Sequence, residues 1–367
     1  MIKMNDPNIS YMGRIDFSDA EAPAFYFAGS QVRFKFTGTA VTVRINNKNV
    51  WGNVSLGYVV DGRLGCVPMD YNNNGKDVDL KIAGALEENT EHTIIIYKRY
   101  AANQMFSLKG IEIENGELVP DDVKYDLKME VYGDSVCAGE VSEAVDFVGR
   151  CDPENHGSIY DNSWHSFVMQ TSRKLNAQIH NIAQGGIAVF NDTGYFHWPK
   201  MIGMESVYDK LCYFPEGGEL TQWDFSKYVP DVVVFALGQN DKHNGITDKD
   251  DLDITDPEYH EKWKNGYKKI IRALSENYGS KTKFVLTTTL LNHDKTWDDA
   301  IEEIKNELNA EGIKAYHNVF KRNGCATHGH PRIPEHNEMA EELTSFITSS
   351  VLYRELCLSC CGRLRIS

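Results

Sequence analysis

The sequence of 367 residues is poor in basic residues and has no long apolar segment. It contains 38 Lys and Arg residues against 53 Asp and Glu residues, and the formal net charge is -15. A nucleic-acid partner requires clustered Lys and Arg that neutralise phosphates, so this charge balance argues against that class. A membrane-spanning helix needs about 18 consecutive apolar residues, and the sequence has no such run. We therefore expect neither a nucleic acid nor a membrane as a partner.

The beginning of the sequence lacks a targeting segment. Residues 1–7 are polar and do not show the apolar stretch of a secretory signal peptide. We expect a cytoplasmic protein, or a secreted one if a leader has been removed. Hydrophobic residues make up 41% of the chain and charged residues 25%, as in an ordinary soluble protein with a sizeable core. At one domain per roughly 150 residues, the length predicts two domains.

The sequence also lacks a metal-binding cysteine pattern. Its eight cysteines are scattered, which favours free thiols in a reducing compartment over a disulfide framework. Cys357 and Cys360 form one Cys-x-x-Cys, but no second pair or histidine cluster completes a zinc site. We expect no metal and no cofactor, and we interpret residues 356–367 as a flexible tail.

Residues 1–120 are predicted to form an all-β domain. Turn formers separate short strands, several of which alternate apolar and polar residues, at 25–27, 32–36, 41–45, 54–60 and 93–97. Many short strands with one buried face predict a β-sandwich of the jelly-roll type. Trp51 and Tyr71 are candidates for stacking on sugars, although core packing is the commoner role of any single aromatic residue.

Residues 121–355 show strands that alternate with helices, after a polar boundary segment at 115–122. Strands are expected at 127–132, 178–182, 232–237, 283–289 and 313–319, and helices at 162–176, 259–278, 297–310 and 335–352. The continuous apolar run at 232–237 is typical of a strand buried on both faces. This alternation predicts a doubly wound α/β/α domain around a parallel sheet.

Four residues follow predicted strands or precede the last helix: Ser135, Gly186, Asn240 and His330. In a doubly wound sheet, the loops at the carboxyl ends of the strands form the functional site. Gly133-Asp134-Ser135 ends the first of these strands, and a serine on such a sharp turn exposes its hydroxyl. The alternative is an ordinary turn in which Asp134 or Ser135 caps a helix.

A serine hydroxyl becomes a useful nucleophile only when a base takes its proton, and histidine is the usual base near neutral pH. His330 is the best placed of the 12 histidines, with His328, His317 and His336 as rivals. Each of them has the alternative role of a solvated or core-satisfied side chain.

Acyl transfer also requires hydrogen-bond donors for the developing oxyanion. The backbone N–H of Ser135 would lie at a helix N-terminus, and glycine at position 186 lets the backbone approach a substrate closely. The side-chain amide of Asn240 is a third candidate. A tight turn at Gly186 and a strand-ending Asx turn at Asn240 are the structural alternatives.

The order of these blocks, Gly-Asp-Ser, Gly, Gly-Gln-Asn-Asp and His-Pro, resembles the SGNH (GDSL-type) hydrolases. With a β domain in front, the chain resembles carbohydrate esterase family 2 in particular. The matching segments are Gly13-Arg14-Ile15-Asp16-Phe17-Ser18, Trp223-Asp224-Phe225-Ser226, Pro230-Asp231-Val232-Val233-Val234, His330-Pro331 and Met339-Ala340-Glu341-Glu342-Leu343. The resemblance covers nearly the whole chain except the last dozen or so residues.

This resemblance implies an esterase that removes acetyl groups from xylan, glucomannan or their oligosaccharides. Ser135 would be the nucleophile, His330 the base, and Ser135, Gly186 and Asn240 the oxyanion donors. Many members of the superfamily carry Asp three residues before the histidine, where this chain has Thr327. Unless an Asp or Glu arrives from elsewhere in the chain, we therefore expect a Ser–His dyad in which a backbone carbonyl or another neutral group orients His330. In a true dyad, Thr327→Ala should retain most of the activity.

Two other functions remain open on the sequence alone. One is a lipase-like or thioesterase member of the same superfamily, which would prefer long acyl chains. The other is a carbohydrate-binding protein whose hydrolase half is catalytically silent. The sequence does not decide between a monomer and a homo-oligomer, nor which sugar is the substrate.

Overall fold

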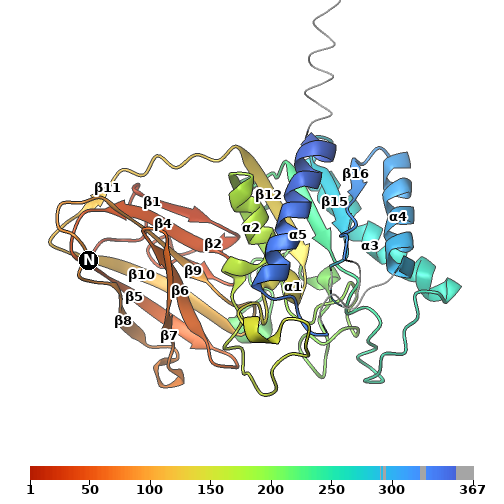
Figure 1. Cartoon of the computed structure of the whole chain (residues 1–367), viewed down its shortest axis with the longest axis horizontal. Coiled ribbons are helices and arrows are strands. Elements are labelled where there is room, and N and C mark those ends of the chain that lie inside the picture. The colour runs from red at the N-terminus through yellow and green to blue at the C-terminus, as the bar shows by residue number, and fades with distance from the viewer. Residues whose placement is uncertain (290, 292–294, 323–327, 353–367) are drawn as a thin grey trace, which may run out of the picture.

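The computed structural model describes residues 1–289, 291, 295–322 and 328–352. Figure 1 shows two parts, with antiparallel strands in the N-terminal third of the chain and a helix-covered sheet in the remainder. The antiparallel part ends with β11 (Leu118–Val119), and the parallel sheet begins with β12 (Leu127–Gly133). The fold class predicted from the sequence is confirmed.

The N-terminal part is a sandwich of two antiparallel sheets. The first sheet consists, in spatial order, of β1 (Ile9–Met12), β4 (Gln31–Phe36), β9 (His92–Lys98), β6 (Ser55–Val60) and β7 (Arg63–Pro68), and β11 pairs with β4. The second consists of β2 (Ile15–Asp16), β3 (Ala24–Phe25), β10 (Gln104–Glu114), β5 (Ala40–Asn49) and β8 (Asp77–Ala83). Apolar side chains from both sheets, such as Phe34, Val43 and Ile96, form one buried cluster between them. Removal of this apolar surface from water holds the two sheets together.

The C-terminal part is built on five parallel strands. Their spatial order is β13 (Ala177–Ala183), β12, β14 (Val232–Ala236), β15 (Lys283–Thr287) and β16 (Ala315–His317). The chain moves outward from β12 in both directions, so the strand order reverses beside β12. Ligands bind at this kind of switch point, outside the carboxyl ends of the strands.

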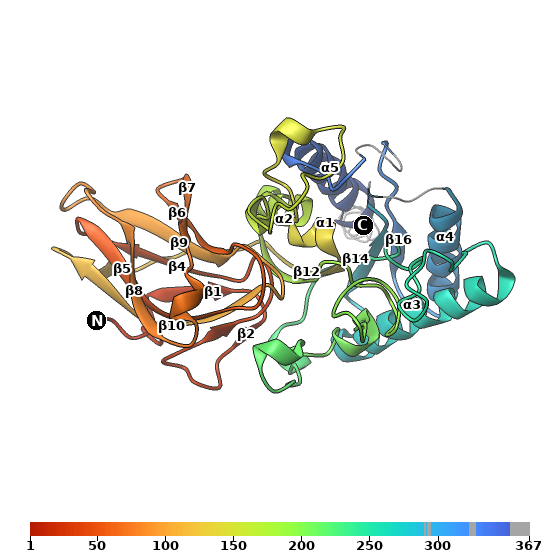
Figure 2. The same ribbon diagram turned by 90° about the horizontal axis from the view of Figure 1, so that it is seen from below.

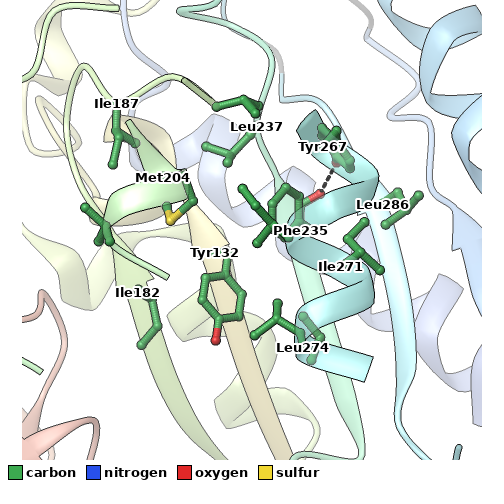
Figure 3. Packing of buried hydrophobic residues seen from close by; sticks show 14 of the residues in the cluster. Tyr132, Ile182, Ile187, Met204, Phe235, Leu237, Tyr267, Ile271, Leu274 and Leu286 are labelled. Atoms are coloured by element: carbon green, nitrogen blue, oxygen red, sulfur yellow. Dashed lines mark hydrogen bonds between the residues drawn. The ribbon is translucent and has the colours of Figure 1, made fainter. Parts of the chain in front are cut away.

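Helices cover both faces of the parallel sheet. The helices α1 (Ser135–Ala138), α2 (Phe167–Lys174) and α5 (Ile333–Phe346) pack on one face, and α3 (Pro257–Tyr278) and α4 (Lys295–Ala310) pack on the other. Figure 2 shows α1, α2 and α5 across the sheet from α3. Figure 3 shows the α3 side, where Tyr132 and Phe235 of the sheet pack near Tyr267 and Leu274 of α3. The Tyr267 hydroxyl donates to the Phe235 carbonyl at 3.0 Å, which satisfies a polar group inside this apolar layer.

Short helical turns complete the structure and modify two of the expected helices. The segment expected as one helix at 162–176 is a 3-10 turn followed by α2, because the hydroxyl of Ser166 accepts from Met169 N at 3.4 Å and starts a new helix. The last helix continues from α5 into a π-helix, η7 (Ile347–Leu352). The 3-10 turns are η1 (Tyr71–Asn73), η2 (Val145–Phe147), η3 (Ser163–His165), η4 (Met204–Ser206), η5 (Pro215–Gly217) and η6 (Phe225–Lys227). None of the described helices is long and apolar enough to cross a membrane.

The two parts are joined through polar groups buried between them. Arg14 of the sandwich is fully buried, and its guanidinium donates to the carbonyls of Tyr208 and Lys210, each at 2.8 Å. It also donates to Glu130 Oε1 at 3.1 Å and to the Tyr132 hydroxyl at 3.0 Å, both on β12. The sandwich is therefore anchored directly to β12, the strand that leads to Ser135.

Candidate active site

Ser135 is the first residue of α1, directly beyond the carboxyl end of β12. Asp134 is the N-cap of this helix, and its side chain accepts from Val136 N at 3.0 Å. A Cβ on Gly133 would lie 2.4 Å from Cys137 Sγ, so glycine is needed for α1 to pack this closely on the end of the strand. The structure thus combines both interpretations of the motif: Asp134 caps the helix, and Ser135 lines a pocket.

His330 reaches Ser135 from the loop before α5. Its Nε2 lies 2.9 Å from Ser135 Oγ, which is hydrogen-bond distance for transfer of a proton from serine to imidazole. Burial alone would lower the pKa of His330, but the hydrogen bond to a carboxylate raises it, and the net shift is upward. A histidine with a raised pKa accepts the serine proton readily, because the nearby carboxylate stabilises the imidazolium that forms.

The carboxylate is Asp152, and its position shows that the expected Ser–His dyad was wrong. Asp152 Oδ2 lies 2.7 Å from His330 Nδ1, and Asp152 Oδ1 accepts from His330 N at 2.9 Å. Asp152 belongs to the connection between η2 and η3, remote in sequence from His330. Thr327, where the sequence lacks the usual Asp, lies outside the described residues, so the prediction for Thr327→Ala stays a prediction.

Two neighbours of His330 hold Asp152 in place. A Cβ on Gly329 would lie 2.2 Å from Asp152 Oδ1, so only glycine at this position lets the carboxylate approach. The buried guanidinium of Arg332 donates to Asp152 Oδ1 at 2.8 Å and also to the His330 carbonyl. Burial would raise the pKa of Asp152, but its hydrogen bond with His330 and the nearby Arg332 lower it far below the usual value. Asp152 is therefore ionised throughout the range in which His330 acts as a base.

The rival histidines occupy other positions. His336 is buried in α5, where its Nδ1 accepts from Phe167 N at 3.1 Å. His317 Nδ1 lies 3.1 Å from Glu302 Oε2 on α4. His328 is exposed and lines the pocket, but Ser135 bonds to His330. His330 is thus the histidine that the structure brings to the serine, as predicted.

The three residues with candidate oxyanion donors, Ser135, Gly186 and Asn240, line the same pocket. The Ser135 N–H is the first of α1 and therefore precedes the intrahelical hydrogen bonds. Gly186 has φ +73°, and a Cβ there would lie 3.0 Å from Tyr195 Cβ. Asn240 Nδ2 donates to the Ile187 carbonyl at 2.9 Å, which leaves the second amide hydrogen free to serve a ligand. The oxyanion roles stay predictions, and the geometry is compatible with them.

A buried carboxyl group connects the two loops that carry Gly186 and Asn240. Asp241 Oδ1 accepts from Val189 N at 2.9 Å and from Trp263 Nε1 at 3.0 Å. Burial raises the pKa of Asp241 to about 7. Asp241 therefore links the two loops to each other and to α3.

The pocket has a volume of about 720 Å³ and is lined from both parts of the chain. The sandwich contributes Val50, Trp51 and Ala102, and the α/β part contributes Ser135, Glu140 and a loop that carries Tyr195 and Trp198. Trp51 is 50% exposed and Trp198 69% exposed, so both rings are open to a ligand. Tyr71, the other aromatic candidate, does not line this pocket, and its hydroxyl donates to the Gly52 carbonyl at 2.9 Å.

One group in the described residues has the composition of a metal site: His260, Glu261 and Glu303 on α3 and α4. Lys264 Nζ lies 2.8 Å from Glu303 and 3.0 Å from Glu261, so a cation already neutralises these carboxylates. We assign no metal to it. The predicted tail at 356–367, with Cys357 and Cys360, lies outside the described residues.

The sequence reasoning did not identify Asp152, which bonds to His330, or Glu140, which lines the pocket. Asp152 lies in a loop with no periodic pattern, and its pairing with His330 spans 178 residues. Glu140 comes shortly after the Gly-Asp-Ser motif and directly follows Gly139, whose left-handed conformation (φ +78°) ends α1. The signal for Glu140 was its place directly after this turn, where the chain leaves the nucleophile's helix.

Comparisons with known proteins identify relatives along the chain. Residues 11–121 match the family model described as carbohydrate esterase 2 N-terminal. The chain is 29% identical over 363 residues to the cellulase/esterase CelE of Acetivibrio thermocellus, covering 95% of this chain but 40% of the length of CelE. It is 24% identical over 346 residues to an acetylxylan esterase / glucomannan deacetylase of Cellvibrio japonicus, covering 94% of this chain and 89% of that protein.

Two solved structures have the same fold over nearly the full length. A family two carbohydrate esterase from Clostridium thermocellum, in complex with cellohexaose, is 27% identical with a TM-score of 0.77 and covers 94% of this chain and 99% of that chain. A family two carbohydrate esterase from Cellvibrio japonicus is 23% identical with a TM-score of 0.75 and covers 94% and 96%. The N-terminal third of the chain thus matches carbohydrate esterase family 2, and nearly the whole chain is similar in sequence and fold to esterases of that family.

Proposed function

We propose that this protein is a serine esterase that removes O-acetyl groups from plant-cell-wall polysaccharides or their oligosaccharides, through an acetyl-enzyme intermediate. The observation that carries the proposal is the continuous hydrogen-bonded chain from Ser135 Oγ through His330 to Asp152, at the floor of an open pocket. The relative named acetylxylan esterase / glucomannan deacetylase supports the choice of substrate.

The proposed reaction uses Ser135, His330 and the candidate oxyanion donors in their observed positions. Ser135 Oγ attacks the acetyl carbonyl carbon while His330 Nε2 takes the hydroxyl proton. The oxyanion forms beside the N–H groups of Ser135 and Gly186 and the amide of Asn240. The C–O bond to the sugar then breaks, and His330 returns the proton to the leaving oxygen. A water molecule, activated by the same histidine, releases acetate and restores Ser135.

The exposed rings of Trp51 and Trp198 support a sugar as the alcohol part of the substrate. An aromatic face offers a flat apolar surface that suits the C–H face of a pyranose ring. Trp51 lies on the connection between β5 and β6, where its N–H donates to the Asn103 carbonyl at 3.3 Å. The sandwich thus supplies a wall of the pocket, and this would give it a role in substrate binding.

The test is a panel of acetate-release assays with acetylated xylo-, manno- and gluco-oligosaccharides, together with 4-nitrophenyl acetate and 4-nitrophenyl octanoate. We expect acetate from at least one sugar series and a clear preference for the acetyl over the octanoyl ester. A preference for octanoate would instead support a lipase-like or thioesterase function. Binding of oligosaccharides without any release of acetate would support a catalytically silent binding protein.

A further inference from the structure

Glu140 is fixed by the same turn that fixes the candidate nucleophile. Gly139 ends α1 in a left-handed conformation, and a Cβ there would lie 2.5 Å from the carbonyl oxygen of Asn162. The backbone N–H of Glu140 donates to the Ser135 carbonyl at 3.0 Å. The side chain of Glu140 then turns into the pocket beside Ser135.

The carboxyl group of Glu140 lies between two parts of the reaction centre. Its Oε1 occupies the space above Gly185, where a Cβ would lie at 1.7 Å from this oxygen. Its Oε2 lies 4.0 Å from His330 Nε2, the nitrogen that also bonds to Ser135 Oγ. The Glu140 side chain is 20% exposed, and among the described residues its carboxyl oxygens have no hydrogen-bond partner. Its hydrogen-bonding capacity is therefore available to a ligand.

The surroundings of Glu140 favour the neutral acid. Burial raises the pKa of this carboxyl, and the negative charges of Asp161 and Asp134 raise it further, against the opposing effect of His330. Asp152, on the other side of His330, has its pKa lowered instead. The pKa values of two carboxyl groups near one histidine are thus shifted in opposite directions, which is how one site can give them different roles.

We propose that Glu140 is a specificity-determining residue, whose carboxyl group hydrogen-bonds the free hydroxyl that neighbours the acetylated oxygen on the sugar. This inference rests on the function proposed above. The leaving oxygen must come close to His330 Nε2 to receive its proton, and Glu140 Oε2 lies next to that nitrogen. A hydroxyl on the adjacent ring carbon then falls beside the carboxyl group, which donates through its O–H and accepts through its other oxygen.

The test compares three substrates: a methyl xyloside acetylated at one hydroxyl with its neighbour free, the same xyloside with that neighbour O-methylated, and 4-nitrophenyl acetate. For the wild-type protein we expect kcat/KM about ten- to a hundredfold higher with the free neighbour than with the methylated one, the usual effect of one buried hydrogen bond. In Glu140→Ala this preference should fall to within about threefold, through loss of activity on the free-hydroxyl substrate.

Glu140→Gln separates this role from a purely structural one. An amide has the same shape as the protonated carboxyl and retains one kind of donor and one acceptor, so it should keep most of the preference. Glu154→Ala removes an exposed carboxylate from the loop that carries Asp152 and should leave all three rates unchanged. Thermal unfolding midpoints of all variants establish that the fold is intact.

Three results would overturn the proposal. If the wild-type protein does not discriminate between the two xylosides, no group of the protein hydrogen-bonds the neighbouring hydroxyl. If Glu140→Ala loses the same factor on all three substrates, Glu140 only supports His330. If Glu140→Gln loses as much preference as Glu140→Ala, the neutral acid is not the acting group. Failure of the proposed function itself is distinct, because the wild-type protein would then cleave neither xyloside whatever its rate on 4-nitrophenyl acetate.

Discussion

At the scale of single residues, the site depends on three side chains that come from distant parts of the sequence. Ser135 follows β12, Asp152 lies on a loop after α1, and His330 precedes α5. Each of the two hydrogen bonds that join them is short, 2.9 Å and 2.7 Å. Asp152 fixes the orientation of the imidazole ring and stabilises its protonated form, as the acidic member of a triad does.

Asp152→Asn should lower kcat by about a hundred- to ten-thousandfold, because the amide cannot stabilise the imidazolium. KM should change far less, since Asp152 does not line the pocket. Steady-state kinetics on 4-nitrophenyl acetate measures both constants. Asp146→Asn, at an exposed position in η2, is the matched control and should behave as the wild type. An Asp152→Asn variant with nearly full kcat would show that Ser135 and His330 act as a dyad without Asp152.

The pH dependence follows from the pKa of His330. Because only neutral imidazole accepts the serine proton, kcat/KM should rise with pH through this pKa. Burial opposes the charged form, but the hydrogen bond to Asp152 favours it more, so the midpoint should lie above the usual histidine value of about 6.5. In Asp152→Asn the midpoint should move to lower pH, since the stabilising charge is gone. A midpoint that stays in place or moves upward would show that Asp152 does not set this pKa.

The sequence predicted two members of this triad and missed the third, for a physical reason. Ser135 and His330 occur in loops whose position follows from the strand and helix pattern, and the family resemblance supported their roles. Asp152 occurs in an irregular segment, and its approach to His330 depends on tertiary packing and on the absence of a side chain at Gly329. No spacing in the sequence encodes that approach.

At the scale of elements, the side chains of the candidate site lie on loops or at the start of a helix, and the helices and strands position those segments. The loop 328–332 holds Gly329, His330 and Arg332 in successive contacts with Asp152. Arg332 is also the N-cap of α5, and its backbone N–H donates to the carboxylate of Glu335 at 2.9 Å. The start of α5 therefore fixes the orientation of the catalytic loop.

Gly329→Ala should lower kcat by about ten- to a hundredfold, because the added methyl group displaces the Asp152 carboxylate. The double variant Gly329→Ala/Asp152→Asn should be little slower than Asp152→Asn alone, since both changes break the same contact. Kinetics of the four proteins in this cycle measure the coupling. Fully additive losses would show that Gly329 acts on something other than Asp152.

The elements themselves were predicted in type more accurately than in extent. The five parallel strands lie where the apolar runs indicated, because a strand buried on both faces has a distinctive composition. The strand β10 was missed although its residues alternate from Gln104 to Glu114, and it is interrupted by a bulge between Leu108 and Gly110. The expected helix at 162–176 starts four to five residues later as α2, because Ser166 caps it.

At the scale of the whole molecule, the sandwich is part of the site as well as attached to it. It anchors β12 through Arg14, and it contributes Trp51 and Ala102 to the pocket. The Ala102 N–H donates to Gln184 Oε1 at 2.9 Å, which ties the sandwich to the loop that carries Gly186. Removal of the sandwich would therefore disturb the pocket and its oxyanion side together.

Arg14→Ala should lower the free energy of unfolding by about 3–5 kcal/mol, because it leaves the carboxylate of Glu130 buried without its cationic partner. Denaturant unfolding monitored by tryptophan fluorescence measures this change. Arg44→Ala, which removes an exposed ion pair with Asp79, is the control and should have a much smaller effect. A similar loss in the two variants would contradict the anchoring role of Arg14.

The most direct test of the account is capture of the acetyl-enzyme with an acetylated xylo-oligosaccharide. Rapid acid quenching followed by peptide mass spectrometry should find one acetyl group on the peptide that contains Ser135, formed as fast as or faster than acetate is released. In Ser135→Ala this adduct should be absent, and acetate release should fall by about a thousandfold or more while the fold remains intact. Acetate release that persists in Ser135→Ala would contradict the role of Ser135 as the nucleophile.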